Sequence, residues 1–455
     1  MVFAHYMLAN QDYVSSDAPS EVVIASYERE IRQAQNIGID GFALNAGGWF
    51  KEPRYILRAS EMFEAAYRLH TDFKLMFSAD MCCSNEAADI EDMMRRFANN
   101  PRYRPSYFTR NNSFVLTTFA GARLGPQFWR ELRNDLEKGT RPSQRDAPNA
   151  LDYVNGVPSS APLQITLVPA FFWGGEVPQQ TDIQRGLAAY KNSIDGAFYW
   201  GIAGVPGLGR TPDQIPSSEA YARALHAAGK IYMAPICFQF WGANANRYFE
   251  YSGYAGMRKL WMDAINVTHP EWVEIITWND FVEGTYISPI EDPAKYPSAN
   301  DLGNSIAPPS TLNFFHTHSG ATELLAFYIR WYKTGTQPGI QADAIFWAYR
   351  TQTSPVIGAK AHRLKLYGPL ADRIYITANL KAPAVLCVSV AGTSKSFRLP
   401  AGSSDIKVPY SLSSSAPEFQ LIRGTTTIVE SRGTDAIMTI QDIPDIYYST
   451  GFMHD

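Results

Sequence analysis

The sequence has few cysteines and no long apolar run, and these absences exclude several classes of protein. Its 455 residues contain four cysteines, of which Cys82 and Cys83 are neighbours. Adjacent cysteines do not suit a disulfide framework, and the pattern lacks the paired Cys and His spacings of a zinc site. No stretch of eighteen apolar residues is present, so no membrane-spanning helix is expected. We therefore expect no zinc site and no membrane partner.

An excess of one charge is also missing. The chain has 40 Lys and Arg against 44 Asp and Glu, for a formal charge of −4, and it contains no basic block. This balance gives no reason to expect a nucleic-acid partner. Aromatic residues, by contrast, reach 13%. Large cores use aromatics, and so do surfaces that stack against sugar rings, so composition alone does not separate these two readings.

The start of the sequence, MVFAHYML, lacks the basic segment and cleavage site of a signal peptide. Two localisations follow as expectations. The protein is secreted or held in a cell wall if a leader was removed, and it is intracellular otherwise.

One rhythm of short apolar strand, polar loop and amphipathic helix runs through residues 1–337. Nearly continuous apolar strands are typical of parallel sheets that are buried on both faces. Eight such units predict an α/β fold, specifically a (β/α)8 barrel. A doubly wound open sheet is the competing fold, and it is disfavoured because no Gly-rich phosphate loop follows the first strand. The strands are expected in VFAHYML, GFALNAG, KLMFSAD, FVLTTFAG, LQITLVPAFFW, GAFYWG, IYMAPICFQF and WVEIITWNDF.

The pattern changes after the segment TGTQPGI. Residues 341–455 carry short alternating strands such as RIYITANL and AVLCVSVAG, separated by Gly, Ser and Pro turns. This pattern predicts an all-β sandwich domain at the C-terminus, behind a catalytic barrel domain that covers residues 1–337.

In such a barrel, the loops that follow the strands meet at one face, where chemistry is placed. Polar and aromatic residues at the predicted strand ends are therefore the candidate site. They are His5, Asn45, Asp80, Trp173, Tyr199, Trp200, Gln239, Trp241, Asn244, Trp278, Asn279, Asp280, Glu283 and Tyr286. Asp40 and Asp195 precede their strands and belong to the opposite face, where a structural role is expected.

The segment IITWNDFVEGTYISP holds the most informative pair, Asp280 and Glu283. Cleavage of a glycosidic bond needs one carboxylic acid that protonates the leaving oxygen and one carboxylate that activates water or attacks carbon. An Asp-x-x-Glu spacing is weak evidence alone, because an ordinary acidic loop also produces it. Its place after the eighth strand, among aromatics, favours the catalytic interpretation. Asp80 could support the pair or anchor a loop, and His5 could pack in the core or bind a sugar hydroxyl.

Several segments resemble glycoside hydrolase family 71, the fungal α-1,3-glucanase or mutanase family. They are FKLMFSADMCC, DGAFYWGIAGVPG, KIYMAPICFQFW and above all EIITWNDFVEGTYISPIED. The resemblance implies hydrolysis of α-1,3-glucan with inversion, no cofactor, and a barrel followed by a β-sandwich. It implies that Asp280 is the base, Glu283 the acid and Asp80 a supporting acid.

Two alternatives remain open from the residues. A barrel glycosidase could act on a different glucan, and a glucan-binding protein could keep the aromatic rim without turnover. The spacing of two residues in a turn is compatible with inverting and with retaining geometry. We expect a polysaccharide as the only partner and a monomeric protein.

Overall fold

The computed structural model describes most of the chain, in the ranges 1–8, 18–52, 54–82, 85–139, 147, 150–157, 160–205, 213–242, 247–290, 316–353, 365–367, 370–410, 415–437 and 448–455. These residues form two compact units. The first consists of Met1–Gly201, Ile215–Ile236 and Asn266–Asn279, and the second of Ile202–Gln214, Cys237–Ile265 and Asp280–Asp455. The predicted domain boundary between residues 337 and 341 stays a prediction.

The α-helices of the described residues are α1 (Ser20–Asn36), α2 (Arg54–Leu69), α3 (Ala87–Ala98), α4 (Gly125–Lys138), α5 (Gln180–Tyr190), α6 (Ile215–Ala227), α7 (Tyr254–Asp263) and α8 (Ser319–Thr334). None of them combines the length and the apolar character that crossing a bilayer requires.

The strands of the first unit are β1 (Val2–Met7), β2 (Gly41–Gly47), β3 (Lys74–Asp80), β4 (Thr109–Arg110), β5 (Ser113–Phe119), β6 (Ile165–Ala170), β7 (Gly196–Phe198), β8 (Ile231–Ile236) and β11 (Trp272–Ile275). Those of the second unit are β9 (Phe240–Gly242), β10 (Arg247–Phe249), β12 (Ala344–Arg350), β13 (Lys365–Tyr367), β14 (Arg373–Leu380), β15 (Ala384–Val390), β16 (Thr393–Leu399), β17 (Gly402–Pro409), β18 (Glu418–Arg423), β19 (Thr426–Arg432) and β20 (Tyr448–His454).

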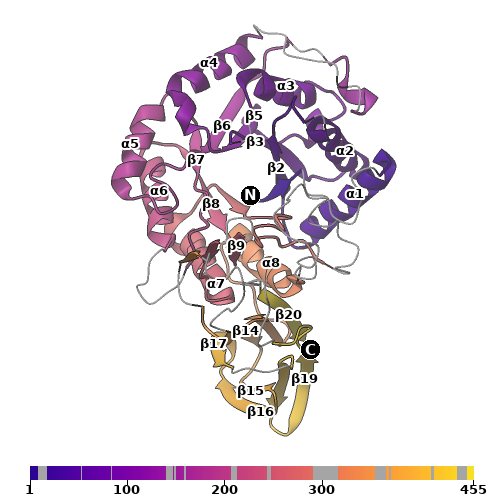
Figure 1. The fold of residues 1–455 in the computed structure, drawn as a ribbon, viewed down its shortest axis with the longest axis vertical. Helices are drawn as coiled ribbons and strands as arrows, with labels where there is room; N and C mark the ends of the chain where they lie inside the picture. The colour runs from indigo at the N-terminus through magenta and orange to yellow at the C-terminus, as the bar shows by residue number, and fades with distance from the viewer. Residues whose placement is uncertain are drawn as a thin grey trace. The chain divides into compact units, whose positions relative to one another are not determined.

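A curled parallel sheet is the framework of the first unit. Its strands follow the order β6–β5–β3–β2–β1–β11–β8–β7. The first strand therefore pairs with the last, and Ala4 lies opposite Ile275. At the ends of this order, the N–H of Asp195, just before β7, donates to the Leu167 carbonyl of β6 at 2.9 Å. Figure 1 shows the strands as a curved wall with α1 to α6 on its outside.

The strands are apolar along nearly their whole length because their side chains are buried on both faces of the sheet. On the outer face, Tyr6 of β1 contacts Tyr27 of α1, with ring centroids 6.0 Å apart. Side chains alternate along a strand, so His5, the neighbour of Tyr6, belongs to the inner face. All eight strands predicted for this part of the chain are present. The run IYMAPICFQF, predicted as one strand, divides into β8 and β9, which belong to different sheets.

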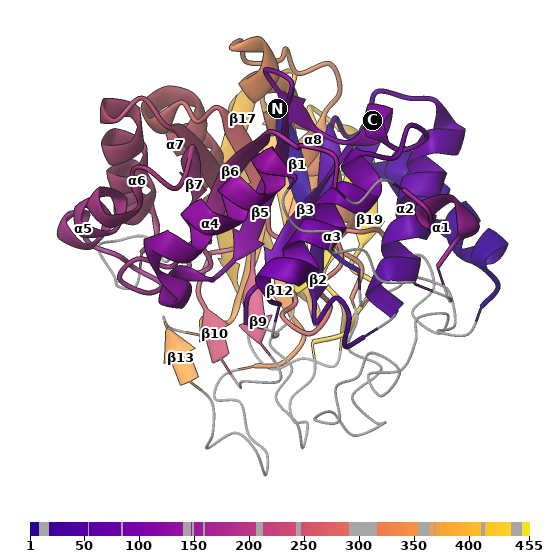
Figure 2. The same cartoon turned by 90° about the horizontal axis from the view of Figure 1, so that it is seen from above.

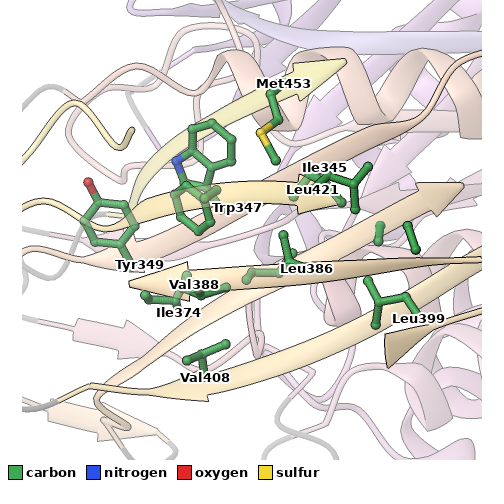
Figure 3. Close-up of a cluster of buried hydrophobic side chains, with 14 of the residues drawn as sticks. Ile345, Trp347, Tyr349, Ile374, Leu386, Val388, Leu399, Val408, Leu421 and Met453 are labelled. Atoms are coloured by element: carbon green, nitrogen blue, oxygen red, sulfur yellow. The ribbon is translucent and has the colours of Figure 1, made fainter. Parts of the chain in front are cut away.

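The second unit contains three sheets. The short strands β13, β10 and β9 form one, and they lie side by side in Figure 2. The other two are antiparallel, with orders β17–β14–β12–β20 and β16–β15–β18–β19. One buried cluster joins both antiparallel sheets, and Figure 3 shows its side chains between the strands. Within it, Trp347 of β12 stacks on Phe419 of β18 at 4.3 Å between ring centroids.

Candidate active site

The carboxyl ends of the parallel strands carry the polar residues of the first unit. Alternation along β1, β2 and β3 places His5, Asn45 and Asp80 on the inner face of the sheet. They lie on neighbouring strands, since β2 pairs with both β1 and β3. The inner face therefore gathers three of the predicted site residues.

His5 forms a buried hydrogen bond that the sequence did not predict. Its Nδ1 lies 2.7 Å from Oε1 of Glu274 on β11, and both side chains are almost completely buried. Burial raises the pKa of Glu274, while the His5 hydrogen bond opposes that rise. The His5 ring also contacts Trp200, with centroids 4.6 Å apart. His5, Glu274 and Trp200 thus form one packed group on the inner face.

Asp80 ends β3 and shapes the turn that follows. Its Oδ1 accepts the N–H of Cys82 at 2.9 Å, and its own carbonyl accepts a hydrogen bond from Asn85 at 3.0 Å. The residue is buried, with an exposed fraction of 8%. Asp80 therefore anchors a loop, which is one of the two roles considered for it from the sequence.

Trp278 and Asn279 fix the end of β11 within the first unit. The Trp278 ring is completely buried, and its Nε1 donates to Oε2 of Glu30 on α1 at 2.9 Å. The Asn279 amide makes two hydrogen bonds with the backbone of Met7, 2.7 Å from its N–H and 3.1 Å from its carbonyl. These protein partners account for both side chains.

Two further aromatics of the candidate set face helices. Trp173 and Tyr199 both stack on Tyr221 of α6, with centroids at 5.9 and 5.1 Å. The Tyr199 hydroxyl donates to the Glu176 carbonyl at 2.7 Å. These side chains pack the space between the sheet and its helices.

The carboxylate pair lies in the second unit, in the turn that begins at Asp280. Oδ1 of Asp280 accepts the N–H of Glu283 at 3.0 Å. Both side chains are half-buried, in contrast to the completely buried Trp278 and Asn279 that precede them. The hydrogen bond fixes the Glu283 backbone relative to the Asp280 carboxylate. The sequence pattern therefore produces two half-buried acids on one hydrogen-bonded turn.

The surroundings of this turn are buried. The Trp241 N–H donates to the Glu283 carbonyl at 2.9 Å, and the Gln239 side chain donates to the Gly284 carbonyl. Tyr286 follows the turn in the sequence, and its hydroxyl donates to the His316 carbonyl at 2.6 Å. Asn244, also predicted as a site residue, lies outside the described residues.

Cys237 follows β8, and its thiol lies close enough to Glu283 for that carboxylate to affect its pKa. Its thiol donates to the Gln239 carbonyl at 2.9 Å. Burial raises its pKa to about 12, and the negative charge of Glu283 adds to the rise. The thiol therefore stays protonated and neutral beside the carboxylates.

The acids at the opposite end of the strands have the structural roles that were predicted for them. Asp40 accepts the N–H of Val2 at 2.8 Å. Asp195 accepts hydrogen bonds from the Leu167 N–H at 2.8 Å and from Arg133 at 2.6 Å. Both carboxylates join neighbouring strands or helices at the end of the sheet where the strands begin.

Three buried residues with polar contacts were not predicted from the sequence. Glu274 carried a signal, because a charged residue inside the apolar strand WVEII needs a buried partner. Glu30 and His318 carried none, since their roles depend on contacts with residues far away in the chain. Among the described residues, no group of three His, Cys, Asp or Glu side chains could hold a metal ion.

Known proteins resemble the chain along almost its whole length. The family model described as Glycosyl hydrolase family 71 matches residues 1–449. A glucan endo-1,3-alpha-glucosidase of Schizosaccharomyces pombe is 24% identical over 96% of this chain and 91% of its own. A mutanase of Penicillium rubens is 25% identical over 95% of this chain and 84% of its own. An endo-alpha-mannosidase structure from Bacteroides thetaiotaomicron aligns with a TM-score of 0.46 and 10% identity, over 73% of this chain and 98% of that chain.

Proposed function

The chain belongs to glycosyl hydrolase family 71, and from this we propose that it hydrolyses α-1,3-glucosidic linkages in α-1,3-glucan. Its relatives support this substrate, because they are a glucan endo-1,3-alpha-glucosidase, an ascus wall endo-1,3-alpha-glucanase and a mutanase. The word "wall" in one of these names supports a secreted or cell-wall location, which we include in the proposal.

The observation that carries the proposal is the turn that holds Asp280 and Glu283. Hydrolysis of a glycosidic bond needs two carboxyl groups at a fixed separation that substrate can reach. The hydrogen bond from the Glu283 N–H to Asp280 and the half-buried state of both side chains support the choice of this pair.

We assign Asp280 as the base and Glu283 as the acid. A base must accept a proton, and the Asp280 carboxylate already acts as an acceptor, for the Glu283 N–H. Ionised Asp280 would take a proton from the attacking water, while protonated Glu283 would give its proton to the leaving oxygen. Inversion at the anomeric carbon follows if water stands between Asp280 and the sugar, which requires carboxyl groups about 6.5–9.5 Å apart.

We propose Asp80, His5, Asn45 and Trp200 as sugar-binding residues of the first unit. They share the inner face at the carboxyl ends of the strands, and the His5 Nε2 has no hydrogen-bond partner among the described residues. Tyr199, Trp278 and Tyr286 have protein partners that account for their rings, so we leave them out of the proposed sugar contacts. Trp173 stacks on Tyr221, but its buried Nε1 has no hydrogen-bond partner among the described residues.

We propose that the fold is a (β/α)8 barrel of residues 1–337 with a β-sandwich of residues 341–455. The pairing of β1 with β11 and the hydrogen bond from Asp195 to Leu167 support closure of the parallel sheet. The core shared by the two antiparallel sheets supports a sandwich.

A panel of polysaccharides tests the proposed function. The protein is incubated with insoluble α-1,3-glucan and, separately, with β-1,3-, α-1,4- and α-1,6-glucans, and the released reducing ends are measured. We expect release from α-1,3-glucan alone. Release from another polymer only would replace the substrate, and tight binding to α-1,3-glucan without products would show a binding protein instead of an enzyme.

A further inference from the structure

One amide side chain, that of Gln239, forms a hydrogen bond with the backbone of the proposed catalytic turn at Gly284. We propose that Gln239 is a positioning residue for Asp280 and Glu283, acting through the backbone of the turn. This inference rests on the proposed function. It replaces the sequence prediction that Gln239 binds sugar, because the side chain is 2% exposed and its polar atoms are engaged within the protein.

The backbone of the turn sets the separation of the two carboxylates. Asp280 accepts the Glu283 N–H, so any shift of residues 283 and 284 changes where the Glu283 carboxyl lies. Two donors near β9 hold this segment in place. The Trp241 N–H donates to the Glu283 carbonyl at 2.9 Å, and the Gln239 Nε2 donates to the Gly284 carbonyl. Displacement of a reacting group by about 1 Å can cost about 100-fold in rate.

The orientation of the Gln239 amide is fixed by its other neighbours. Its Oε1 lies 2.9 Å from the backbone N of Tyr448 on β20. A backbone N–H can only donate, so the oxygen must face Tyr448 and the NH2 group must face Gly284. The amide therefore connects the turn to the last strand of the chain, and a flipped amide would lose both hydrogen bonds.

His318 completes the network as a neutral acceptor. Its Nδ1 lies 2.6 Å from the Tyr286 carbonyl and must donate to it, which leaves Nε2 with a lone pair. That Nε2 is 3.2 Å from the Gln239 Nε2 and accepts its second proton. Complete burial lowers the pKa of His318 to about 3, so the ring is neutral from pH 4 upward. Both polar atoms of the Gln239 side chain therefore have hydrogen-bond partners within the protein.

Two substitutions at one position test the inference. Gln239→Met keeps the shape and removes all three interactions. Gln239→Glu keeps the acceptor for Tyr448, but it can donate only while its new carboxyl is protonated. The measurements are kcat and KM on soluble α-1,3-gluco-oligosaccharides from pH 4 to pH 8, and the thermal unfolding temperature. A control, Tyr410→Phe, removes a buried hydrogen bond to the Arg350 carbonyl, on the C-terminal sheets.

We expect Gln239→Met to lower kcat by about 10- to 100-fold while KM changes less than about threefold, because groups on the turn move and substrate contacts stay. Gln239→Glu should recover activity as the pH falls, relative to the wild-type profile. Tyr410→Phe should keep its kcat even where its unfolding temperature drops equally.

Three results would overturn the inference. These are a folded Gln239→Met protein with wild-type kcat, a Gln239→Glu profile parallel to that of the wild type, and a loss of kcat in Tyr410→Phe that matches the loss in Gln239→Met. If the wild type cleaves only another glucan, the proposed substrate fails, and the same comparison on that glucan still tests Gln239.

Discussion

Individual hydrogen bonds hold the turn that carries the two proposed catalytic acids, Asp280 and Glu283. A solvated loop would leave the carboxylates at no fixed separation. Here the Asp280 carboxylate accepts the Glu283 N–H, and Trp241 holds the Glu283 carbonyl. Side chains that are rigidly supported give catalytic groups the fixed geometry that rate enhancement needs.

Glu30 gives the fold a pH dependence at the residue scale. Burial raises its pKa from 4.5 to about 7, while its bonds with Tyr6 and Trp278 and the charge of Arg29 oppose the rise. Between those two values the folded protein holds a proton that the unfolded chain has lost. The free energy of unfolding therefore falls as the pH rises through this window.

We expect Glu30→Gln to be more stable than the wild type at pH 8, by up to about 3 kcal/mol, with the difference vanishing near pH 4. The glutamine oxygen still accepts the Trp278 N–H and carries no charge to bury. Urea unfolding at several pH values measures this. Glu28→Gln is the control, because Glu28 lies on the same helix and pairs with the exposed Arg32. Equal pH slopes for Glu30→Gln and the wild type would show that Glu30 does not titrate in this window.

The predicted acids and the predicted aromatics have different surroundings in the structure. Asp280 and Glu283 follow a buried strand and are half-buried, as the local pattern at a strand end leads one to expect. Trp278 lies in the same segment but faces α1, because side chains of one strand alternate between two faces. Without a known register, the sequence does not say which aromatic faces the inner side.

At the scale of elements, β20 has a central place in the second unit. It pairs with β12 along its whole length, and its Tyr448 N–H binds Gln239. Gly451 lies where β20 passes the Trp347 ring, and a Cβ at this position would lie 2.5 Å from that ring. Glycine is required there by the close approach of the strand to a buried indole.

We expect Gly451→Ala to lower the free energy of unfolding by about 1–3 kcal/mol, since a rigid, stacked indole cannot yield to the added methyl group. Gly339→Ala is the matched control, because its methyl group would meet only the end of the Gln341 side chain at 3.1 Å. Chemical unfolding of both variants measures the difference. Equal stability of the two variants would contradict the packing that we describe around Trp347.

The elements themselves were largely predictable. Each parallel strand is a short apolar run bounded by polar turns, and two of them, GFALNAG and KLMFSAD, coincide with β2 and β3 residue for residue. The short sheet of β9, β10 and β13 was not predicted. Its strands have three residues each, and β10 pairs with β13, which lies more than a hundred residues later in the chain.

At the scale of the whole molecule, the two compact units do not follow the order of the sequence. The second unit takes α7, β9 and β10 together with the C-terminal sheets. Within it, Gly253 before α7 lies against Tyr375 of β14, and Gly320 of α8 lies against the Gly451 carbonyl of β20. Such packing makes the C-terminal sheets part of the support for residues 280–290.

A truncated chain of residues 1–337 should therefore fail to fold or should lose its activity. Removal of β12, β14 and β20 would expose buried faces of α7 and α8 and would take away the Tyr448 partner of Gln239. Soluble yield, circular dichroism and hydrolysis of α-1,3-glucan, measured beside the full chain, test this. A soluble truncated protein with full activity would show that the barrel is an independent domain and that the sheets are dispensable.

The most direct test of the account follows the reaction by proton NMR. A soluble α-1,3-gluco-oligosaccharide is incubated with the wild type, with Asp280→Asn and with Glu283→Gln, and the anomeric signals of fresh product are recorded. We predict that the wild type releases the β-anomer first and that each variant loses more than about 100-fold in rate, since each lacks one of the two proton transfers. Near-wild-type turnover in either variant, or no product from the wild type, would contradict the assignment of this pair.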